Sequence, residues 1–223
     1  MHSVLTTGAW VGLGAAAPIA VTDWAAKHRH MRALEYVCKP LTMVALLGAA
    51  IALDPVSDTQ RTWFVVALLM SLAGDVFLML PERRLGPTDT FTLGLGAFLL
   101  GHLAFIAGFV ARGVGSAWVA VALVGAAAIL VNVAPKIVRG ARAEDPALGA
   151  AVSLYIAVIV VMLLAAWSSG VAAAAIGAVL FVSSDAMIGF SRFVRPFAGH
   201  ELAIIVTYHA AQALLVVSLA TGS

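Results

Sequence analysis

The chain has 223 residues, of which 62% are hydrophobic and 11% are charged, and its mean hydropathy is +1.03. A soluble domain of this size could not cover so much apolar surface, so the composition excludes that class and predicts a membrane protein with several spans. The chain has 13 Lys and Arg against 11 Asp and Glu. In a membrane protein this small excess reflects topology, and we expect no nucleic-acid partner.

Eight apolar segments follow one another along the chain, and a bilayer core needs about 20 such residues per spanning helix. We therefore predict an all-α fold in which residues 1–223 form a single bundle of eight transmembrane helices. The first segment, 4–22, lacks the basic start of a signal peptide, so we expect a retained helix. The other expected helices span 37–53, 63–80, 91–111, 116–134, 148–168, 170–190 and 201–220.

The loops between the expected helices alternate in charge. Eleven Lys and Arg fall after the first, third, fifth and seventh helices, and only two fall in the other loops. Because positively charged loops stay in the cytoplasm, this split predicts that both termini lie on the non-cytoplasmic side. We expect an integral protein of the bacterial inner membrane.

Two carboxylates, Asp75 and Asp185, lie well inside expected spans. At 1.5 Å per residue, each is about 9–10 Å from the cytoplasmic end of its helix, so the site is expected toward the cytoplasmic leaflet. Other polar side chains lie beside these carboxylates or in the same half of the bundle. The candidates for binding or orienting a substrate are Lys39, Ser71, His102, Tyr155, Ser184, Arg192, Tyr208 and His209.

An ionisable group inside a membrane is costly, so two carboxylates at one depth indicate a functional site. The alternative is a structural hydrogen bond between helices. Ser71 lies four residues before Asp75 on the same helix face, where it can hydrogen-bond the carboxylate. Gly74 and the Ser183–Ser184 pair are small, so a partner helix or a ligand can come close.

The candidate cations and histidines each have two interpretations. Lys39 and Arg192 either reach out to lipid headgroups or hold a substrate phosphate. His102 and His209 are either hydrogen-bonded packing groups or members of a catalytic site.

No established catalytic or cofactor motif occurs in the chain. HExxH, CxxC and GxSxG are absent, and the glycines at 94–96 lack the pattern of a dinucleotide-binding loop. We therefore predict neither a cofactor nor a metal. A metal site built from Asp75, Asp185, His102 and His209 would draw on four helices, so sequence spacing does not test it.

Several short motifs in a fixed order resemble those of the YhhN-like lysoplasmalogenase family, over nearly the whole chain. They are KPLTM at 39–43, SLAGDVFLML at 71–80, GHLAF at 101–105, Tyr155, SSDAMIGFSRF at 183–193 and YHAAQALL at 208–215. The resemblance implies an integral membrane hydrolase that cleaves the vinyl ether bond of lysoplasmalogens. The products would be a fatty aldehyde and a glycerophospho-choline or -ethanolamine.

The family's two intramembrane aspartates match Asp75 and Asp185 here. The partners implied are a lysophospholipid substrate and membrane lipid. Many bacterial members come from aerobes thought to lack plasmalogens, so another lysolipid or ether lipid stays open as the natural substrate.

Vinyl ether hydrolysis needs acid, because its slow step is proton transfer to the β carbon. Two aspartates near each other at low dielectric suit this step, since like charges do not both ionise cheaply. Our hypothesis is that one aspartate is the general acid, while the other stabilises the cation and activates water. The sequence does not assign the two roles.

A proton-coupled transporter is the competing interpretation, because membrane carboxylates also relay protons. A carrier usually has polar or helix-breaking features near the midplane of the membrane. Here the polar side chains are biased to one side, and no expected helix is broken in mid-span by a Gly/Pro pair. The sequence therefore favours the hydrolase.

Overall fold

A computed structural model describes residues 5–81, 83–85 and 88–220. The described residues form nine α-helices and one short hairpin, so the expected all-α class is confirmed. The helices are α1 (Thr7–His28), α2 (Arg32–Ala52), α3 (Asp58–Met79), α4 (Thr90–Arg112), α5 (Val119–Asn132), α6 (Ala134–Glu144), α7 (Pro146–Ser168), α8 (Ala172–Phe193) and α9 (His200–Ser218). The hairpin pairs β1 (Arg84–Leu85) with β2 (Thr88–Asp89) in antiparallel register.

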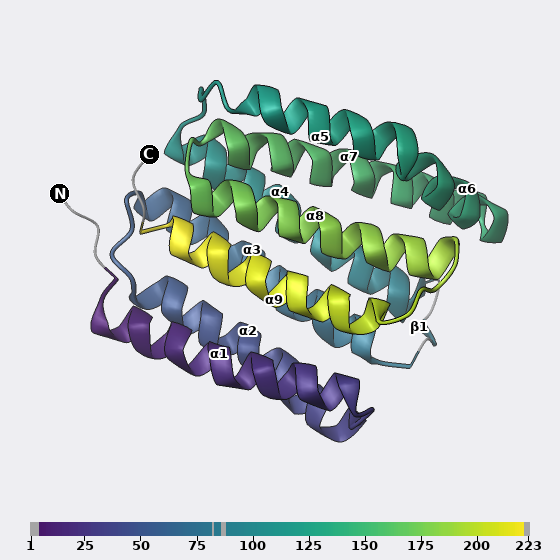
Figure 1. Cartoon of the computed structure of the whole chain (residues 1–223), viewed down its shortest axis with the longest axis horizontal. Helices are drawn as coiled ribbons and strands as arrows, with labels where there is room; N and C mark the ends of the chain where they lie inside the picture. Colours follow the sequence, from purple (N-terminus) through teal and green to yellow (C-terminus); the bar gives the residue numbers. More distant parts are fainter. Residues whose placement is uncertain (1–4, 82, 86–87, 221–223) are drawn as a thin grey trace.

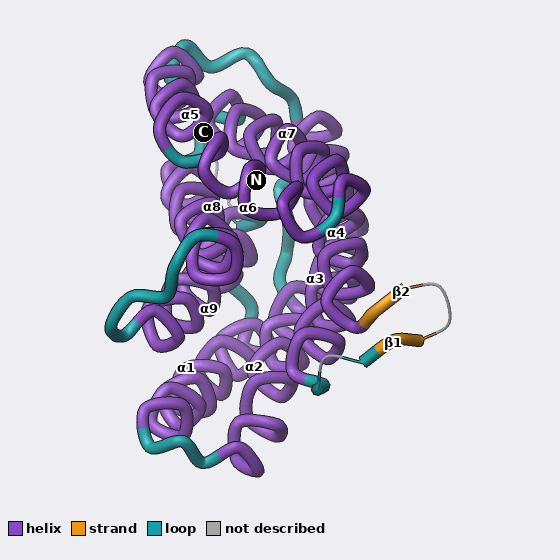
Figure 2. The backbone as a smooth tube through the Cα atoms, turned by 90° about the vertical axis from the view of Figure 1, so that its right-hand side faces the viewer, coloured by secondary structure: helices purple, strands orange, loops and turns teal. Residues whose placement is uncertain are grey.

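The long helices run back and forth along one direction, so that α1 begins and α9 ends at the same end of the bundle (Figure 1). Neighbours in sequence pack as pairs: α1 with α2, α3 with α4, and α8 with α9. Viewed nearly along the helices, α1 and α2 lie together at one edge, and the β1–β2 hairpin projects from the side of the bundle (Figure 2). Helix α9 contacts α1, α2 and α8, and therefore joins the edge pair to the rest.

Six helices of the described chain are long and apolar enough to cross a membrane. They are α2, α3, α4, α7, α8 and α9, and the bent pair α5–α6 would make a seventh. The expected span at 4–22 corresponds to α1, which lies alongside α2 but is not among them. The structure thus supports six or seven of the eight expected spans, and the count of eight stays a prediction.

The expected span 116–134 is the one that the structure changes most. Helix α5 ends at Asn132, and α6 continues after a 41° bend at Val133. The basic residues that we expected in a loop, Lys136, Arg139 and Arg142, therefore lie on a helix. Pro135 stands in the first turn of α6, where its missing N–H is tolerated, so the sequence allows a new helix to start there.

Small residues let α3 and α4 pack closely. A side chain at Gly108 would meet the ring of Phe64 at 2.7 Å, and one at Gly101 would meet the Ala67 carbonyl at 3.3 Å. Phe64 fills the space left by Gly108 and makes edge contacts with Phe105 and Phe109 at centroid distances of 4.9 and 5.1 Å. This apolar cluster holds α3 and α4 in the register that positions the polar residues described below.

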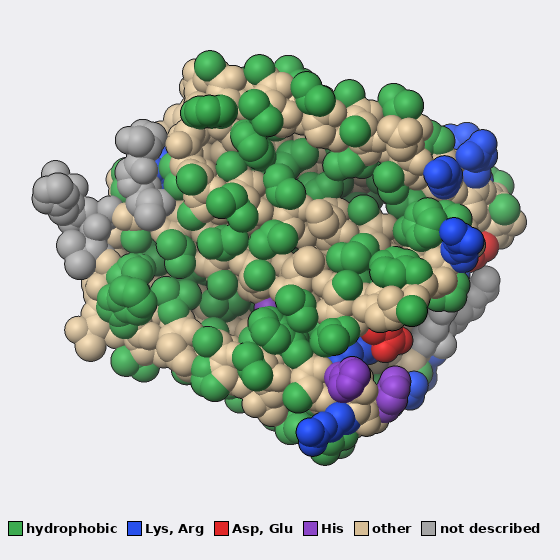
Figure 3. Space-filling model, in the orientation of Figure 1, with side chains coloured by type: hydrophobic (Ala, Val, Ile, Leu, Met, Phe, Trp, Pro, Cys, Tyr) green, Lys and Arg blue, Asp and Glu red, His purple; other side chains and the backbone are tan. Residues whose placement is uncertain are grey.

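Most Lys and Arg side chains gather at one end of the bundle, at the right of the space-filling view (Figure 3). This basic end, where α1, α3, α6 and α8 finish, includes Lys27, Arg83, Arg139, Arg192 and Arg195. The sides of the bundle carry exposed apolar side chains such as Val124, Val131 and Ile176, as lipid contact requires.

Candidate active site

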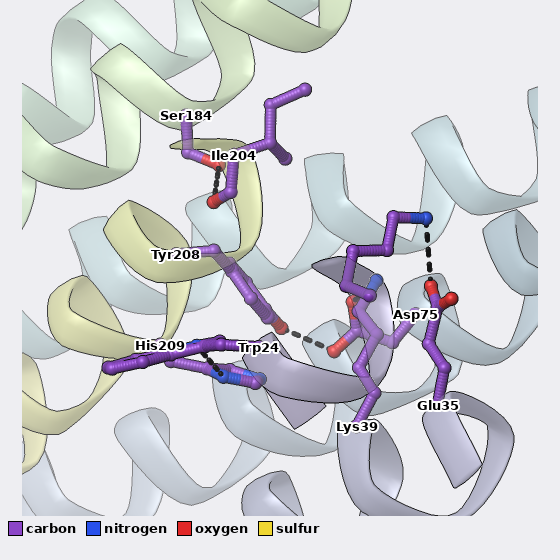
Figure 4. A network of polar contacts seen from close by, with 9 residues as sticks. Trp24, Glu35, Lys39, Asp75, Ser184, Ile204, Tyr208 and His209 are labelled. Atoms are coloured by element: carbon purple, nitrogen blue, oxygen red, sulfur yellow. Dashed lines mark hydrogen bonds and ion pairs between the residues drawn. The ribbon is translucent and has the colours of Figure 1, made fainter. Parts of the chain in front are cut away.

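Asp75 lies on α3 and is held by side chains from two other helices. Lys39 on α2 places its Nζ 2.9 Å from Asp75 Oδ1, and the Tyr208 hydroxyl on α9 donates to Oδ2 at 2.6 Å (Figure 4). Asp75 is only 1% exposed, and Lys39 is 15% exposed at its side chain. The ammonium and the hydroxyl give each oxygen of this buried carboxyl group a partner, which offsets part of the cost of its burial.

Asp185 lies on α8 and has a different set of partners. The Tyr155 hydroxyl on α7 donates to its Oδ2 at 2.5 Å, and His102 Nε2 on α4 lies 3.1 Å from the same oxygen. His102 Nε2 is also 3.0 Å from the Tyr155 hydroxyl. Asp185 therefore shares a compact triangle with two groups that can both be neutral, whereas Asp75 faces a lysine.

Aromatic rings connect the two carboxylate groups. The ring of Phe181 lies 4.7 Å from His102 and 5.6 Å from Tyr208 between centroids, and Phe98 lies 5.9 Å from Tyr208. The two aspartates thus lie in one layer of the bundle, each with its own hydrogen-bonded partners. The structure brings together six of the predicted residues in this way: Lys39, Asp75, His102, Tyr155, Asp185 and Tyr208.

An apolar pocket opens onto Asp185. It lies between α4, α7 and α8, beneath the break between α5 and α6, and has a cavity volume of about 70 Å³. Asp185 and Tyr155 are the lining residues that carry an ionisable group. The other lining residues are aliphatic or aromatic and include Phe98, Ile129, Val133, Ile137, Ile159 and Gly189. The apolar lining suits a short apolar segment of a ligand and places it next to one carboxyl group.

Arg192 lies at the basic end of the same pocket. Its guanidinium is 5.4 Å from the ring centroid of Phe91 and 5.2 Å from that of Phe193, and both rings line the pocket. Arg192 also donates to Glu144 on α6 at 2.7 Å. The guanidinium therefore lies against two aromatic rings of the pocket wall and is paired with one carboxylate.

Comparison with known proteins identifies the chain's relatives. The model of the YhhN family matches residues 34–219. The chain belongs to the YhhN family. Two proteins named lysoplasmalogenase, from Mycobacterium bovis (strain ATCC BAA-935 / AF2122/97) and Mycobacterium tuberculosis (strain CDC 1551 / Oshkosh), are each 35% identical to it over 184 residues. Each alignment covers 78% of this chain and 66% of the relative, just under two thirds of its length. No solved structure matches the chain.

Three further predicted residues of this YhhN protein, Ser71, Ser184 and His209, make no hydrogen bond to either aspartate. Ser71 is buried, but its hydroxyl has no hydrogen-bond partner within the described chain, so the Ser71–Asp75 bond is not formed. Ser184 donates to the Ile204 carbonyl and joins α8 to α9, and His209 Nδ1 accepts from Trp24 Nε1 at 3.1 Å (Figure 4). In the described residues, no group of three or more His, Cys, Asp and Glu side chains could hold a metal.

Asp23 and Trp24 on α1 were not among the predicted site residues. The expected helix ended at residue 22, one position before Asp23, whereas α1 continues to His28. Asp23 is 0% exposed, so a third carboxylate, besides Asp75 and Asp185, lies inside the bundle. The signal was Trp24, a residue that favours a packed position, directly after the aspartate. Both residues precede the stretch that matches the YhhN family.

Gly74 gives a first testable prediction. A side chain at this position would lie 2.5 Å from the ring of Phe98, which lines the pocket. Gly74→Ala should therefore displace Phe98 and lower the free energy of unfolding by about 1–3 kcal/mol, the usual range for overpacking. Unfolding in detergent measures the effect. Gly96→Ala is the control, because nothing lies within 4 Å of that position; equal stability of the two variants would show that the Phe98 contact is not tight.

Proposed function

We propose that this protein is a membrane hydrolase of the lysoplasmalogenase type. It would cleave the vinyl ether of a single-chain phospholipid to a fatty aldehyde and a glycerophospho-base. The observation that carries the proposal is an apolar pocket that ends on the Asp185 carboxyl, with Arg192 at its basic end. The names of the two relatives support the same reaction class.

Asp185 is the proposed general acid. Its hydrogen bonds to Tyr155 and His102 both use Oδ2, so we assign the transferred proton to Oδ1. That proton goes to the β carbon of the vinyl ether and leaves an oxocarbenium ion, which the carboxylate then stabilises. Water adds to the cation and returns a proton, and the hemiacetal collapses to the aldehyde and the alcohol. One water is consumed and no net proton.

Asp75 has a supporting role in this proposal. Both of its oxygens have partners, Oδ1 in Lys39 and Oδ2 in Tyr208, whereas the hydrogen bonds of Asp185 use Oδ2 alone, so we assign the transferred proton to Asp185. Asp75 also fixes the hydroxyl of Tyr208, whose ring packs on Phe98 at the wall of the pocket. Loss of Asp75 would therefore loosen the wall beside the reacting carbon.

The spacing on α8 fits the proposed substrate. Arg192 follows Asp185 by seven residues, so the two lie on one face of the helix about 10 Å apart along its axis. In the proposed substrate the shorter glycerol unit separates the phosphate from the vinyl ether, and the long Arg192 side chain can span the remaining distance along the helix. The hydrocarbon chain would continue past Asp185 toward Val182 and Ile159.

We also propose that the basic end faces the cytoplasm, following the positive-inside rule, so that substrate enters from the inner leaflet. A reporter enzyme that is active only outside the cytoplasm should then be active when fused after Ser223 and inactive when fused after Arg195. The reverse pattern would invert this topology.

A product assay tests the proposed reaction. Purified protein should release aldehyde from lysoplasmenylcholine or lysoplasmenylethanolamine, and release no fatty acid from the matching lysoacyl lipids. Uptake of lysolipid into liposomes without any product would instead favour the transporter.

Arg192→Gln gives a prediction on substrate binding. If Arg192 holds the phosphate, the variant should raise KM for a lysoplasmenyl phospholipid by about tenfold or more, the effect of losing one charge-assisted hydrogen bond. Hydrolysis of an alkenylglycerol, which has no phosphate, should be unchanged. Two controls separate this effect from general loss of charge: Arg195→Gln removes an exposed arginine nearby, and Glu144→Gln breaks only the ion pair. An equal rise in KM for both substrates would rule out the phosphate role.

A further inference from the structure

Asp23 is a fully buried carboxylate for which the proposed reaction has no use. Both of its oxygens are buried, and neither has a hydrogen-bond partner in the described chain. It lies in α1, five residues before the helix ends at His28, or about 8 Å from the basic end at 1.5 Å per residue. A carboxyl group buried without partners is strongly unfavourable, so we expect Asp23 to have a partner besides the described residues.

Helix α9 carries further buried polar atoms that have no hydrogen-bond partner in the described chain, on His209 beside Trp24 and on Gln212 near Tyr208. His209 Nδ1 accepts from Trp24, the neighbour of Asp23, so the neutral ring carries its hydrogen on Nε2. That Nε2 is buried and has no acceptor in the described chain. One turn beyond Tyr208, Gln212 is fully buried, and neither its amide oxygen nor its amide nitrogen has a partner there.

Lys39 links these groups to the candidate active site. Its ammonium lies within electrostatic range of Asp23 and of His209, and its Nζ pairs with Asp75. The ammonium has three N–H donors, so it can hydrogen-bond further acceptors besides Asp75. We call Asp23, Lys39, His209 and Gln212 the polar seam. It runs between α1, α2 and α9, reaches the Asp75–Tyr208 pair and continues one turn past this pair to Gln212.

The seam begins at a charged rim. Lys27 Nζ lies 3.0 Å from Glu35 and 3.3 Å from Glu201, which ties α1 to α2 and α9 at the basic end. Glu201 is 54% exposed at its side chain, and Glu35 is 18% exposed. Polar groups therefore lead from the surface of the bundle to Asp75 without crossing the apolar pocket.

We propose that the polar seam binds a file of ordered water molecules and delivers water to the active site from the basic end. Water fits the seam because it can donate to Asp23 and accept from His209 Nε2 in the same file, and buried waters typically make about three hydrogen bonds. The lining of the apolar pocket is almost wholly apolar and offers water few hydrogen bonds. The water that hydrolysis consumes would therefore enter more easily through the polar seam than through this pocket. Tyr208 joins the two sides, because its hydroxyl meets Asp75 and its ring meets Phe98.

The delivery role rests on the proposed function, but the bound water itself does not. X-ray radiolytic labelling detects it directly, because hydroxyl radicals formed from a bound water modify the side chains next to it. In the wild-type protein, Tyr208 and His209 should be labelled several-fold faster than Phe64 and Phe109, after correction for intrinsic reactivity. All four residues are buried, with at most 4% of their surface exposed, so labelling of Tyr208 and His209 at the core rate would overturn the proposal.

The variant Asp23→Leu/Gln212→Leu should lower the labelling of Tyr208 and His209 to the core rate. Asp58→Leu, at an exposed position at the other end of the bundle, should change nothing. Unchanged labelling in a folded double variant would contradict the role of these side chains, and if this variant does not fold, the wild-type comparison decides alone.

In the aldehyde assay, Asp23→Leu should lower kcat several-fold and leave KM unchanged. Rapid labelling without aldehyde release from any lysolipid would refute the proposed function and leave the water site standing.

Discussion

Asp185→Asn should lower the rate of aldehyde release by about 10²–10⁴-fold, the usual contribution of a positioned general acid. The amide has almost the same shape and still accepts from Tyr155, so the pocket and the fold should be retained. What it lacks is the acidic proton for the β carbon. The loss should therefore appear in kcat, while binding of the lysolipid stays near its wild-type value.

The measurement is aldehyde release by purified variants in detergent, with size-exclusion profile and helical content as checks of folding. Asp58→Asn is the matched control, because this carboxylate lies at the opposite end and is exposed. Asp75→Asn should also lose most of the activity, through the loosened Tyr208. A folded Asp185→Asn variant with near wild-type kcat would show that another group donates the proton.

Lys39→Met should have the largest effect on stability. It removes the ammonium 2.9 Å from Asp75 and leaves a carboxylate that is 1% exposed without its charge partner. Breaking a buried ion pair from one side typically costs about 3–5 kcal/mol, because the remaining charge stays in a low-dielectric site.

A double-mutant cycle isolates that interaction. The double variant Lys39→Met/Asp75→Asn removes both charges, so its free energy of unfolding should recover much of what Lys39→Met loses. Arg61→Met is the control, since Arg61 pairs with Asp58 on the surface, where an ion pair contributes little. If the losses of the two single variants simply add, the Lys39–Asp75 pair does not contribute as the structure indicates.

The helices could be predicted from sequence because spanning a membrane imposes a long apolar run on each one. The expected segments 37–53, 63–80 and 91–111 lie within a few residues of α2, α3 and α4. The same reasoning failed for two helical stretches that carry charged residues, the end of α1 and the whole of α6. Helix α1 carries Asp23 and Lys27 in its last turns, and α6 carries three basic residues, so hydropathy alone assigned both stretches to loops.

The residues of the site could be predicted, but not their partners. Asp75 and Asp185 stand out because charges are rare inside apolar helices. Which helix faces Asp75 depends on packing between segments far apart in sequence, and Lys39 is 36 residues away from it and Tyr208 is 133. Local spacing instead suggested Ser71, whose hydroxyl makes no hydrogen bond within the described chain. The pocket likewise cannot be predicted from local spacing, because six helices, α3 to α8, contribute to its walls.

Hydrolysis in D₂O tests the central claim, proton transfer to the β carbon of a vinyl ether, most directly. The protein should convert a lysoplasmenyl lipid to an aldehyde that carries one solvent deuterium at carbon 2, when the aldehyde is trapped at once as an oxime and analysed by mass spectrometry. Authentic aldehyde in the same buffer corrects for exchange after release. One deuterium per molecule above that control is the predicted result. Aldehyde without the label would mean that the carbon–oxygen bond breaks without protonation at carbon, and would contradict the acid role of Asp185.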